Sequence, residues 1–162
     1  MSRGTTEDIV IRQAETPEQI ATARELFLEY GRSLKFSLCF QSFDQELAGL
    51  PGKYAPPEGR LLLAEFERRP AGCVALRPLG ESICEMKRLY VRPEFRGKRL
   101  GRVLAESILA EARQIGYRRM RLDTVASSMA SAVALYRDLG FVEIPPYCNN
   151  PNEDTLYFER VL

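Results

Sequence analysis

The stretch of sequence that decides the fold is Val91-Arg92-Pro93-Glu94-Phe95-Arg96-Gly97-Lys98-Arg99-Leu100-Gly101-Arg102. A run with strand character, residues 83–91, stops at its proline, and an amphipathic helix is predicted to begin at about Lys98. The first N–H groups of a helix lack acceptors and carry partial positive charge, and Gly97 and Gly101 let oxygens approach the backbone. Basic side chains surround this turn: Arg96, Lys98, Arg99 and Arg102. The stretch therefore predicts a site for the pyrophosphate of a cofactor.

Length and composition are typical of one globular domain, which we expect to span residues 1–162. Hydrophobic residues make up 45% and charged residues 28% of the chain, so a packed core is expected. No run approaches the roughly 20 apolar residues of a membrane span. The N-terminus lacks the apolar centre of a secretion signal, so we expect a cytoplasmic protein without a membrane partner.

The amino-acid inventory excludes several catalytic devices. The chain has no histidine, which removes Ser-His-Asp and Cys-His arrangements. Its four cysteines form no CxxC pair, so no metal site is expected. The net charge of +1 is distributed unevenly, because residues 87–121 carry +8 and the remainder carries −7. One region is therefore expected to attract anions while the rest is acidic.

Periodicity and capping signals divide the chain into strands and helices. Thr16-Pro17-Glu18-Gln19 predicts a helix start, with Thr16 as N-cap and Gln19 closing a capping box. The predicted elements are a strand at 8–13, a helix at 17–34, a helix or lid-like turn at 36–50, a hairpin of strands at 60–67 and 72–77, a strand at 81–91, a helix from about 98 to 115, a strand at 120–124, a helix from about 128 to 139, and strands at 141–144 and 155–161. This order predicts an α/β (α+β) fold in which about four helices flank a mixed sheet with locally parallel strands.

A second pattern accompanies the basic turn: Ala134-Leu135-Tyr136-Arg137-Asp138-Leu139-Gly140-Phe141. It is similar to the A-L-Y-x-x-x-G-F helix end of the GCN5-related N-acetyltransferase (GNAT) superfamily, and residues 96–101 are similar to its Q/R-x-x-G-x-G/A signature. One departure is Arg99, which stands where the first glycine of that signature usually sits. With both motifs in order, the chain resembles this superfamily over nearly its full length. The resemblance implies the fold predicted above and acetyl-CoA as cofactor.

For the cofactor, the resemblance implies three groups of contacts. The pantetheine arm would pair with the backbone of Leu89, Tyr90 and Val91, and the N–H of Leu89 would stabilise negative charge on the thioester oxygen. Ser131 would contact the pantetheine or adenine end. The pyrophosphate would bind the backbone and side chains of Arg96, Gly97, Lys98, Arg99, Leu100 and Gly101, with Arg102 nearby.

For catalysis, the resemblance implies that Tyr136 is the general acid that protonates the departing CoA sulfur, and the alternative is a purely structural core aromatic. Glu85 is the candidate general base, because burial on its strand would raise its pKa toward the useful range. The alternative for Glu85 is a surface carboxylate paired with Lys87. A water chain, Tyr147 or Glu81 would then take the proton.

The expected reaction is transfer of an acetyl group to a primary amine of a small molecule or peptide, by direct attack in a ternary complex. Asp123 and Thr124 end a strand beside the cleft and would make either substrate or structural hydrogen bonds, and Ser127 or Ser128 is expected to cap the next helix. The acidic remainder of the chain favours a cationic acceptor. Residues that would wall the acceptor site, or else belong to the core, are Phe36, Phe40, Phe43, Tyr54, Tyr147, Asn149 and Asn150.

One alternative function keeps the same fold without catalysis, as a CoA-binding regulatory or interaction module. Nucleic-acid binding is not expected, because the basic residues cluster at one glycine turn instead of covering a broad face. The resemblance is also compatible with a homodimer.

Overall fold

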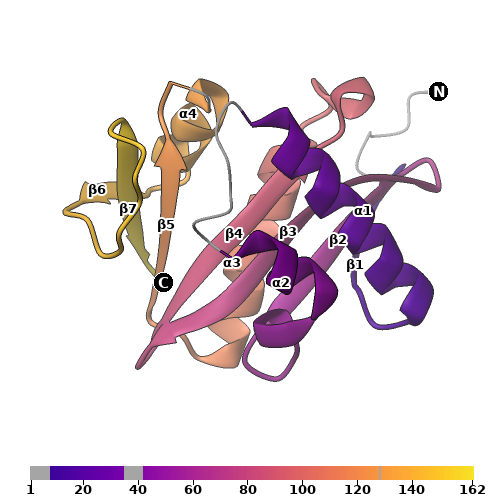
Figure 1. The fold of residues 1–162 in the computed structure, drawn as a ribbon, viewed down its shortest axis with the longest axis horizontal. Helices are drawn as coiled ribbons and strands as arrows, with labels where there is room; N and C mark the ends of the chain where they lie inside the picture. Colours follow the sequence, from indigo (N-terminus) through magenta and orange to yellow (C-terminus); the bar gives the residue numbers. More distant parts are fainter. Residues whose placement is uncertain (1–7, 35–41, 128) are drawn as a thin grey trace.

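The computed structural model describes residues 8–34, 42–127 and 129–162 (Figure 1). Its elements are β1 (Ile9–Gln13), α1 (Pro17–Ser33), α2 (Phe43–Ala48), the 3-10 helix η3 (Gly52–Tyr54), β2 (Arg60–Phe66), β3 (Arg69–Gly80), β4 (Ile83–Val91), the 3-10 helix η4 (Pro93–Phe95), α3 (Leu100–Ile115), β5 (Arg119–Val125), α4 (Ala130–Asp138), β6 (Val142–Ile144) and β7 (Thr155–Val161). This succession of strands and α-helices confirms the predicted order.

Seven strands form one sheet in the order β1-β2-β3-β4-β5-β7-β6. All neighbouring strands are antiparallel except β4 and β5, which are parallel and are connected through α3. The mixed sheet with four α-helices confirms the predicted fold class. The C-terminal strand β7 lies between β5 and β6, so β6 is the edge strand at this end of the sheet. None of the described helices is long and apolar enough to cross a membrane.

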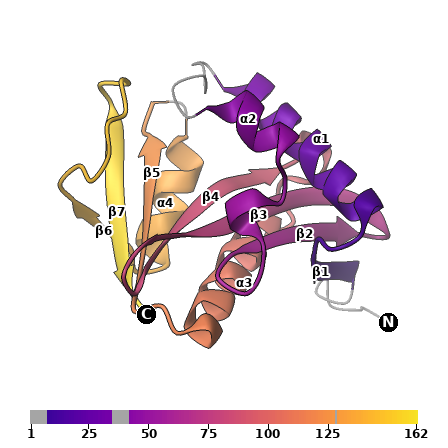
Figure 2. The ribbon, with the colours of Figure 1, turned by 60° about the horizontal axis from the view of Figure 1, so that its bottom comes forward.

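Helices cover both faces of the sheet (Figure 2). Successive residues of a strand point to opposite faces, and β2 shows this alternation clearly. Leu61 and Leu63 pack in the core beneath α1 and α2, whereas Leu62 and Ala64 pack in the core with α3. The sheet therefore separates two hydrophobic cores, and its two faces can serve different parts of a site.

The predicted capping signal is present at the start of α1 but not at the start of α4. Thr16 caps α1 as predicted, since its Oγ1 accepts from the N–H of Gln19 at 3.2 Å and the Gln19 side chain accepts from the Thr16 N–H at 3.1 Å. The prediction of a serine cap on α4 was wrong for Ser127, whose N–H donates to Asp154. Met129 occupies the N-cap position without a side-chain hydrogen bond. Ser128 lies outside the described residues.

Strands β4 and β5 separate part-way along their length, and this separation positions the site. Their pairing is limited to 83–85 against 119–121. Beyond it, the register between β3 and β4 shifts, so that Ala75 faces Lys87 while Cys73 faces Tyr90. The shift is a β-bulge at Arg88, whose φ of 61° lies in the left-handed region. A bulge increases the local bend and twist of its strand, which carries β4 away from β5.

Candidate active site

A cavity of about 850 Å³ opens where β4 and β5 separate. Its lining comes from α1, the bulged half of β4, the turn before α3, the end of β5, the start of α4 and Asn150. The two sequence motifs, which are distant in the chain, therefore both contribute to the lining of one cavity. The predicted site residues that line it are Leu89, Tyr90, Val91, Arg96, Gly97, Arg99, Leu100, Gly101, Ser131 and Tyr136. Glu85, Lys98 and Arg102 are absent from this lining among the described residues.

The N-terminus of α3 fits a phosphate-bearing ligand. The first hydrogen bond of the helix runs from the N–H of Val103 to the carbonyl of Arg99, and no side chain caps the helix. The N–H groups of residues 100–102 therefore find no acceptor in the described part of the chain, as anion binding at a helix end requires. Gly97 has a φ of 83° and open space around its α-carbon. These groups can approach a pyrophosphate directly.

Arg99 adopts the backbone shape that a glycine would allow at its motif position. Its φ of 65° and ψ of 16° are left-handed, and this residue is the N-cap of α3. Such a conformation costs a non-glycine residue roughly 1 kcal/mol. The departure from the family motif therefore leaves the turn intact while adding a positive side chain to the cavity wall. The left-handed Arg99 also explains why α3 begins at Leu100 instead of Lys98.

Two of the predicted phosphate-binding side chains have other contacts. The Lys98 ammonium lies 5.1 Å from the centroid of the Phe66 ring, a cation–π contact. Arg102 forms ion pairs with Asp138 of α4 and with Glu106 one turn along α3. Arg102 therefore connects the two helices that carry the sequence motifs, and its contact with the cofactor stays a prediction.

The bulge in β4 is held by a buried ion pair with α2. Arg88 is 4% exposed, and its Nε and Nη2 each donate to a Glu46 carboxylate oxygen at 2.8 Å. Its guanidinium also lies 5.1 Å from the Phe43 ring centroid. Burial opposes the charge of Arg88, yet the hydrogen bonds to Glu46 raise the pKa of Arg88 above its usual value, so the guanidinium stays charged. Leu89, the predicted oxyanion donor, follows Arg88 directly on the cavity wall.

Tyr136 lies both in the hydrophobic core and on the cavity wall. Its ring packs edge-on against Phe141 at 5.8 Å and against Phe158 at 6.4 Å, so it belongs to the core. It also lines the cavity. Burial raises the pKa of Tyr136, and the charge of Asp123 acts in the same direction. The phenol is therefore protonated throughout the neutral pH range and is able to donate a proton.

The expectation that burial raises the pKa of Glu85 was wrong. Burial, the largest single effect on this 2% exposed residue, does act upward, but Lys87, Tyr147 and Arg77 together lower its pKa below the usual value. One carboxylate oxygen accepts from Arg77 at 2.8 Å and the other from the Tyr147 hydroxyl at 2.6 Å. Both oxygens are engaged, which opposes the predicted role as general base. The salt bridge is with Arg77, whereas Lys87 acts through its charge.

Most of the described residues that were predicted to wall the acceptor site lie outside the cavity lining. Of that predicted set, Asn150 alone lines the cavity among the described residues, and Phe36 and Phe40 lie outside them. Phe43 packs against Arg88, and Tyr54 packs edge-on against Phe27 in the core.

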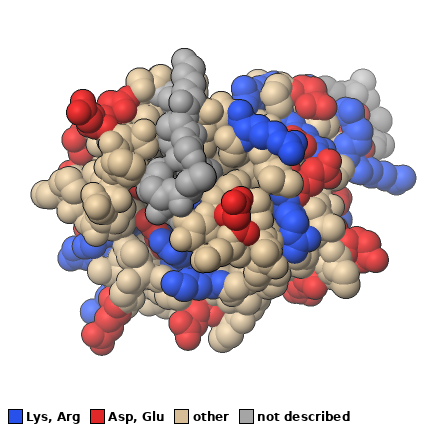
Figure 3. Space-filling view, in the orientation of Figure 1, with Lys and Arg blue, Asp and Glu red and all other residues tan. Residues whose placement is uncertain are grey.

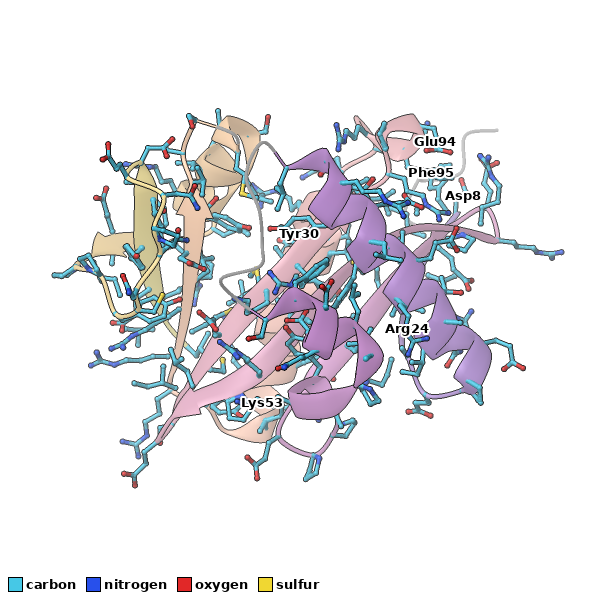
Figure 4. All side chains as sticks on the ribbon, in the orientation of Figure 1. Asp8, Arg24, Tyr30, Lys53, Glu94 and Phe95 are labelled. Carbon is cyan, nitrogen blue, oxygen red and sulfur yellow. The ribbon has the colours of Figure 1, made fainter. Side chains whose placement is uncertain are left out.

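Tyr30, Lys87 and Arg88 are among the lining residues that the sequence did not identify as part of the site. Figure 4 shows Tyr30 beneath the C-terminal half of α1, on the side toward the sheet. The helical period would have identified that position of Tyr30. The bulge that turns Arg88 inward has no such signal.

Asp123 and Thr124, near the end of β5, both line the cavity, and each makes a side-chain contact. Asp123 lines the cavity and accepts from Nδ2 of Asn150 at 3.0 Å. Thr124 also lines the cavity, but its side chain is buried, and its hydroxyl lies 3.1 Å from the Met129 sulfur, which is a structural contact.

The molecular face that carries α1 and α2 displays positive and negative side chains intermixed (Figure 3).

The match to a protein-family model decides the family. Residues 20–141 match the model of the acetyltransferase (GNAT) family. The chain belongs to the GNAT acetyltransferase family. It is also 41% identical over 152 residues to an uncharacterized N-acetyltransferase of Schizosaccharomyces pombe, with 93% of each chain covered. These matches confirm the sequence resemblance and identify the protein as an N-acetyltransferase by homology.

Solved GNAT structures share the fold described above. An acetyltransferase of Staphylococcus aureus superposes with a TM-score of 0.77 at 19% identity, covering 94% of this chain and 98% of that one. A putative acetyltransferase of Salmonella typhimurium, solved with acetyl-CoA, superposes with a TM-score of 0.70 at 20% identity, covering 95% and 94%. The family membership and this fold support the expectation that acetyl-CoA is the donor.

Proposed function

We propose that this GNAT protein transfers the acetyl group of acetyl-CoA to a primary amine by direct attack within a ternary complex. The observation that carries the proposal is the cavity itself. Its lining includes the N-terminus of α3, Leu89 next to the β4 bulge, and Tyr136. A donor bound at α3 and extended along β4 would present its thioester between Leu89 and Tyr136.

The chain supplies the binding groups for such a donor. The free N–H groups at the start of α3 bind phosphate oxygens, and Arg96 and Arg99 add positive charge on the same wall. Arg96 is oriented by a 3.2 Å hydrogen bond from its Nε to the carbonyl of Val91. Within the described part of the chain, the bulged half of β4 has no strand partner on the β5 side, so an extended ligand could pair with its backbone.

Bound acetyl-CoA supplies an activated acetyl thioester. The Leu89 N–H would stabilise the negative charge that develops on the carbonyl oxygen as the amine attacks. The amine nitrogen forms a bond to the carbonyl carbon, the carbon–sulfur bond breaks, and Tyr136 gives its phenolic proton to the sulfur. The proton lost by the amine passes to water at the mouth of the cavity, because both Glu85 oxygens are already engaged.

Calorimetric titration with acetyl-CoA, followed by thiol release with a panel of primary amines, tests the proposal. We expect saturable 1:1 binding and amine-dependent thiol release. Binding without turnover on any amine would indicate the alternative, a CoA-binding module of the same fold. Absence of binding at millimolar acetyl-CoA would overturn the assignment of the cavity as the donor site.

A further inference from the structure

The cavity lies where β4 and β5 separate (Figure 1), and residues from both faces of the sheet line it. On one face, Leu100 and Tyr136 belong to the core that packs with α3. On the other face, Tyr30 packs against the core beneath α1 and α2. A donor bound at the start of α3 would therefore leave the side toward α1 for the acceptor.

One carboxylate, that of Asp123, is present among the described residues that line the cavity. Leu122 packs in the core with α3, and because successive residues of a strand point to opposite faces, Asp123 points toward the α1 side. Burial raises the pKa of Tyr30 and of Tyr136, and the charge of Asp123 adds to both increases. Asp123 therefore acts on residues of both faces, in the region where a donor and an acceptor would meet.

The Asp123 carboxylate is fixed through one of its two oxygens. Its Oδ2 accepts from Nδ2 of Asn150 at 3.0 Å, and the Cys148 sulfur lies 3.9 Å from the same oxygen. Asn150 is itself fixed, because its Oδ1 accepts from the backbone and side chain of Asn152 at 3.0 and 2.9 Å. The Asp123 Oδ1 accepts no hydrogen bond from the described residues. This oxygen can therefore accept an N–H from a ligand while Oδ2 keeps its contact.

The loop that carries Asn150 is attached to the sheet at two further points. The Tyr147 hydroxyl donates to Glu85 of β4 at 2.6 Å, and the Tyr157 hydroxyl of β7 donates to the Cys148 carbonyl at 3.2 Å. The loop is thus held by strands on both sides of the cavity. It can keep a carboxylate in one orientation, as the positioning of a reactant requires.

We propose that Asp123 is the residue that binds and orients the acceptor amine; this rests on the proposed acetyl transfer. The amine binds as an ammonium and donates an N–H to Oδ1 of Asp123. After one proton has passed to water, the nitrogen keeps an N–H on Oδ1, and its lone pair is directed at the thioester carbon. As the carbon–nitrogen bond forms, the nitrogen gains positive charge, which the adjacent carboxylate stabilises.

The protons and bonds of this step balance without a proton on Asp123. The carbon–nitrogen bond forms, the carbon–sulfur bond breaks, and the Tyr136 phenol gives its proton to the sulfur. The second proton lost by the nitrogen returns to Tyr136 through water. Asp123 therefore contributes its charge and its hydrogen bond, and not a proton transfer.

The cations on the same wall have carboxylates other than Asp123. Glu46 binds Arg88 through two hydrogen bonds. Burial lowers the pKa of Lys87, and Glu85 opposes this effect more than Asp123 does. The competing role for Asp123 is to balance the charge of Lys87 within the fold. Such a structural role predicts no difference between charged and neutral acceptors, so an experiment can separate the two.

The first test compares the most reactive amine of the panel with its alcohol analogue, in which a hydroxyl replaces the amine. In protein saturated with CoA no transfer occurs, and calorimetry at pH 7 gives the affinity for each. We expect the amine to bind at least about tenfold more tightly, because it forms a charge-assisted hydrogen bond with Asp123. In Asp123→Asn this ratio should approach one, while the affinity for CoA stays unchanged.

Thiol release measures the kinetic consequence. Asp123→Asn should lower kcat/KM for the amine by roughly tenfold to a hundredfold, because a hydrogen bond to a charged group is lost. Asp123→Glu, which retains the charge, should recover part of the loss. Glu153→Gln is the matched control: it removes one exposed negative charge from the same loop, outside the cavity lining, and should leave both kcat/KM and the binding ratio unchanged.

Asn150→Ala provides a second route that leaves Asp123 in place. It removes the hydrogen bond that orients the carboxylate, so kcat should fall while the amine still binds more tightly than the alcohol. This variant decides the matter if Asp123→Asn does not fold, since an unchanged kcat in Asn150→Ala would contradict the orientation of the amine by Asp123.

The outcomes separate this inference from the proposed function. A binding ratio or a kcat/KM that survives Asp123→Asn would overturn the inference while acetyl transfer stands. A fall in kcat/KM that only follows the folded fraction, with the binding ratio intact, would assign Asp123 the structural role beside Lys87. Acetylation of no amine at all would overturn both proposals.

Discussion

At the scale of single residues, Tyr136 provides the sharpest separation of chemistry from packing. Tyr136→Phe keeps the ring contacts with Phe141 and Phe158 and removes only the hydroxyl. We expect kcat to fall by roughly a hundredfold, because general-acid assistance to the departing sulfur is lost. The affinity for CoA, measured by calorimetry, should change less than about twofold.

Tyr117→Phe is the control for this variant. It removes a hydroxyl that donates to the Glu58 carbonyl at 2.7 Å, outside the cavity lining. Turnover of this control should match the unsubstituted protein. Equal losses of CoA affinity and turnover in Tyr136→Phe would assign Tyr136 a packing role instead.

The lowered pKa of Glu85 predicts that its contribution to the free energy of unfolding depends on pH. Its pKa lies below the reference of 4.5, so its ionised form stabilises the fold above that pH, and the contribution is lost as pH falls through the lowered value. Glu85→Gln should reduce the free energy of unfolding by about 3 kcal/mol at pH 7, because it breaks a buried ion pair. Urea titrations from pH 7 down to pH 3 should show this difference narrowing.

Glu143→Gln, which removes an exposed partner of Arg137, should have almost no effect on stability at either pH. The pH–rate profile then tests the predicted base. Should folded Glu85→Gln lose more than a hundredfold in kcat with the acidic limb of its profile abolished, Glu85 would be the base after all.

At the scale of elements, α2 and the β4 bulge form one unit through Glu46 and Arg88. Glu46→Gln keeps the shape of the side chain but weakens the charge-assisted contacts that hold Arg88 in its left-handed conformation. The Leu89 N–H would then be less well oriented, and we expect kcat to fall about tenfold with little change in CoA affinity.

Steady-state kinetics and calorimetry on three proteins check this coupling. Glu46→Asp, which retains the charge, should recover part of the lost kcat. Glu65→Gln removes the exposed pair with Arg12 and should leave kcat unchanged. A loss of kcat in Glu46→Gln that only follows the folded fraction, or an equal loss in Glu65→Gln, would contradict a positioning role.

The elements could largely be predicted from the sequence, because periodicity and caps are local. The Thr16 capping box and the strand predicted at 60–67 follow directly from neighbouring residues. The bulge could not be predicted, since arginine rarely adopts a positive φ and the Glu46 that binds Arg88 is 42 positions away in the sequence.

The candidate site was predicted in part for the same reason. The turn before α3 and Tyr136 belong to contiguous motifs, and most of these residues line the cavity. The engagement of Glu85 by Arg77 and Tyr147 depends on partners 8 and 62 positions away. Such pairings appear only when the strands and the loop before β7 are assembled.

At the scale of the whole molecule, the sheet consists of two parts that meet weakly along β4 and β5. Their direct pairing is confined to residues 83–85 and 119–121, with α3 packed behind. The cavity lies across this junction and is lined from both sides. A donor bound there would contact β4, the α3 turn and α4 at once, and so stabilise the folded state as a unit.

Binding of acetyl-CoA in the cavity is therefore expected to raise the thermal stability of the protein. At a concentration a hundred times its dissociation constant, acetyl-CoA should stabilise the fold by about 2.7 kcal/mol through mass action. For a chain of this size, that corresponds to a rise in Tm of about 5–10 °C, measurable by scanning calorimetry. Arg96→Ala, which loses a positive group from the cavity wall, should show a smaller rise at the same ligand concentration. An unchanged Tm in excess acetyl-CoA would mean that the folded protein does not bind it, whereas an equal rise in Arg96→Ala would remove that side chain from the donor site.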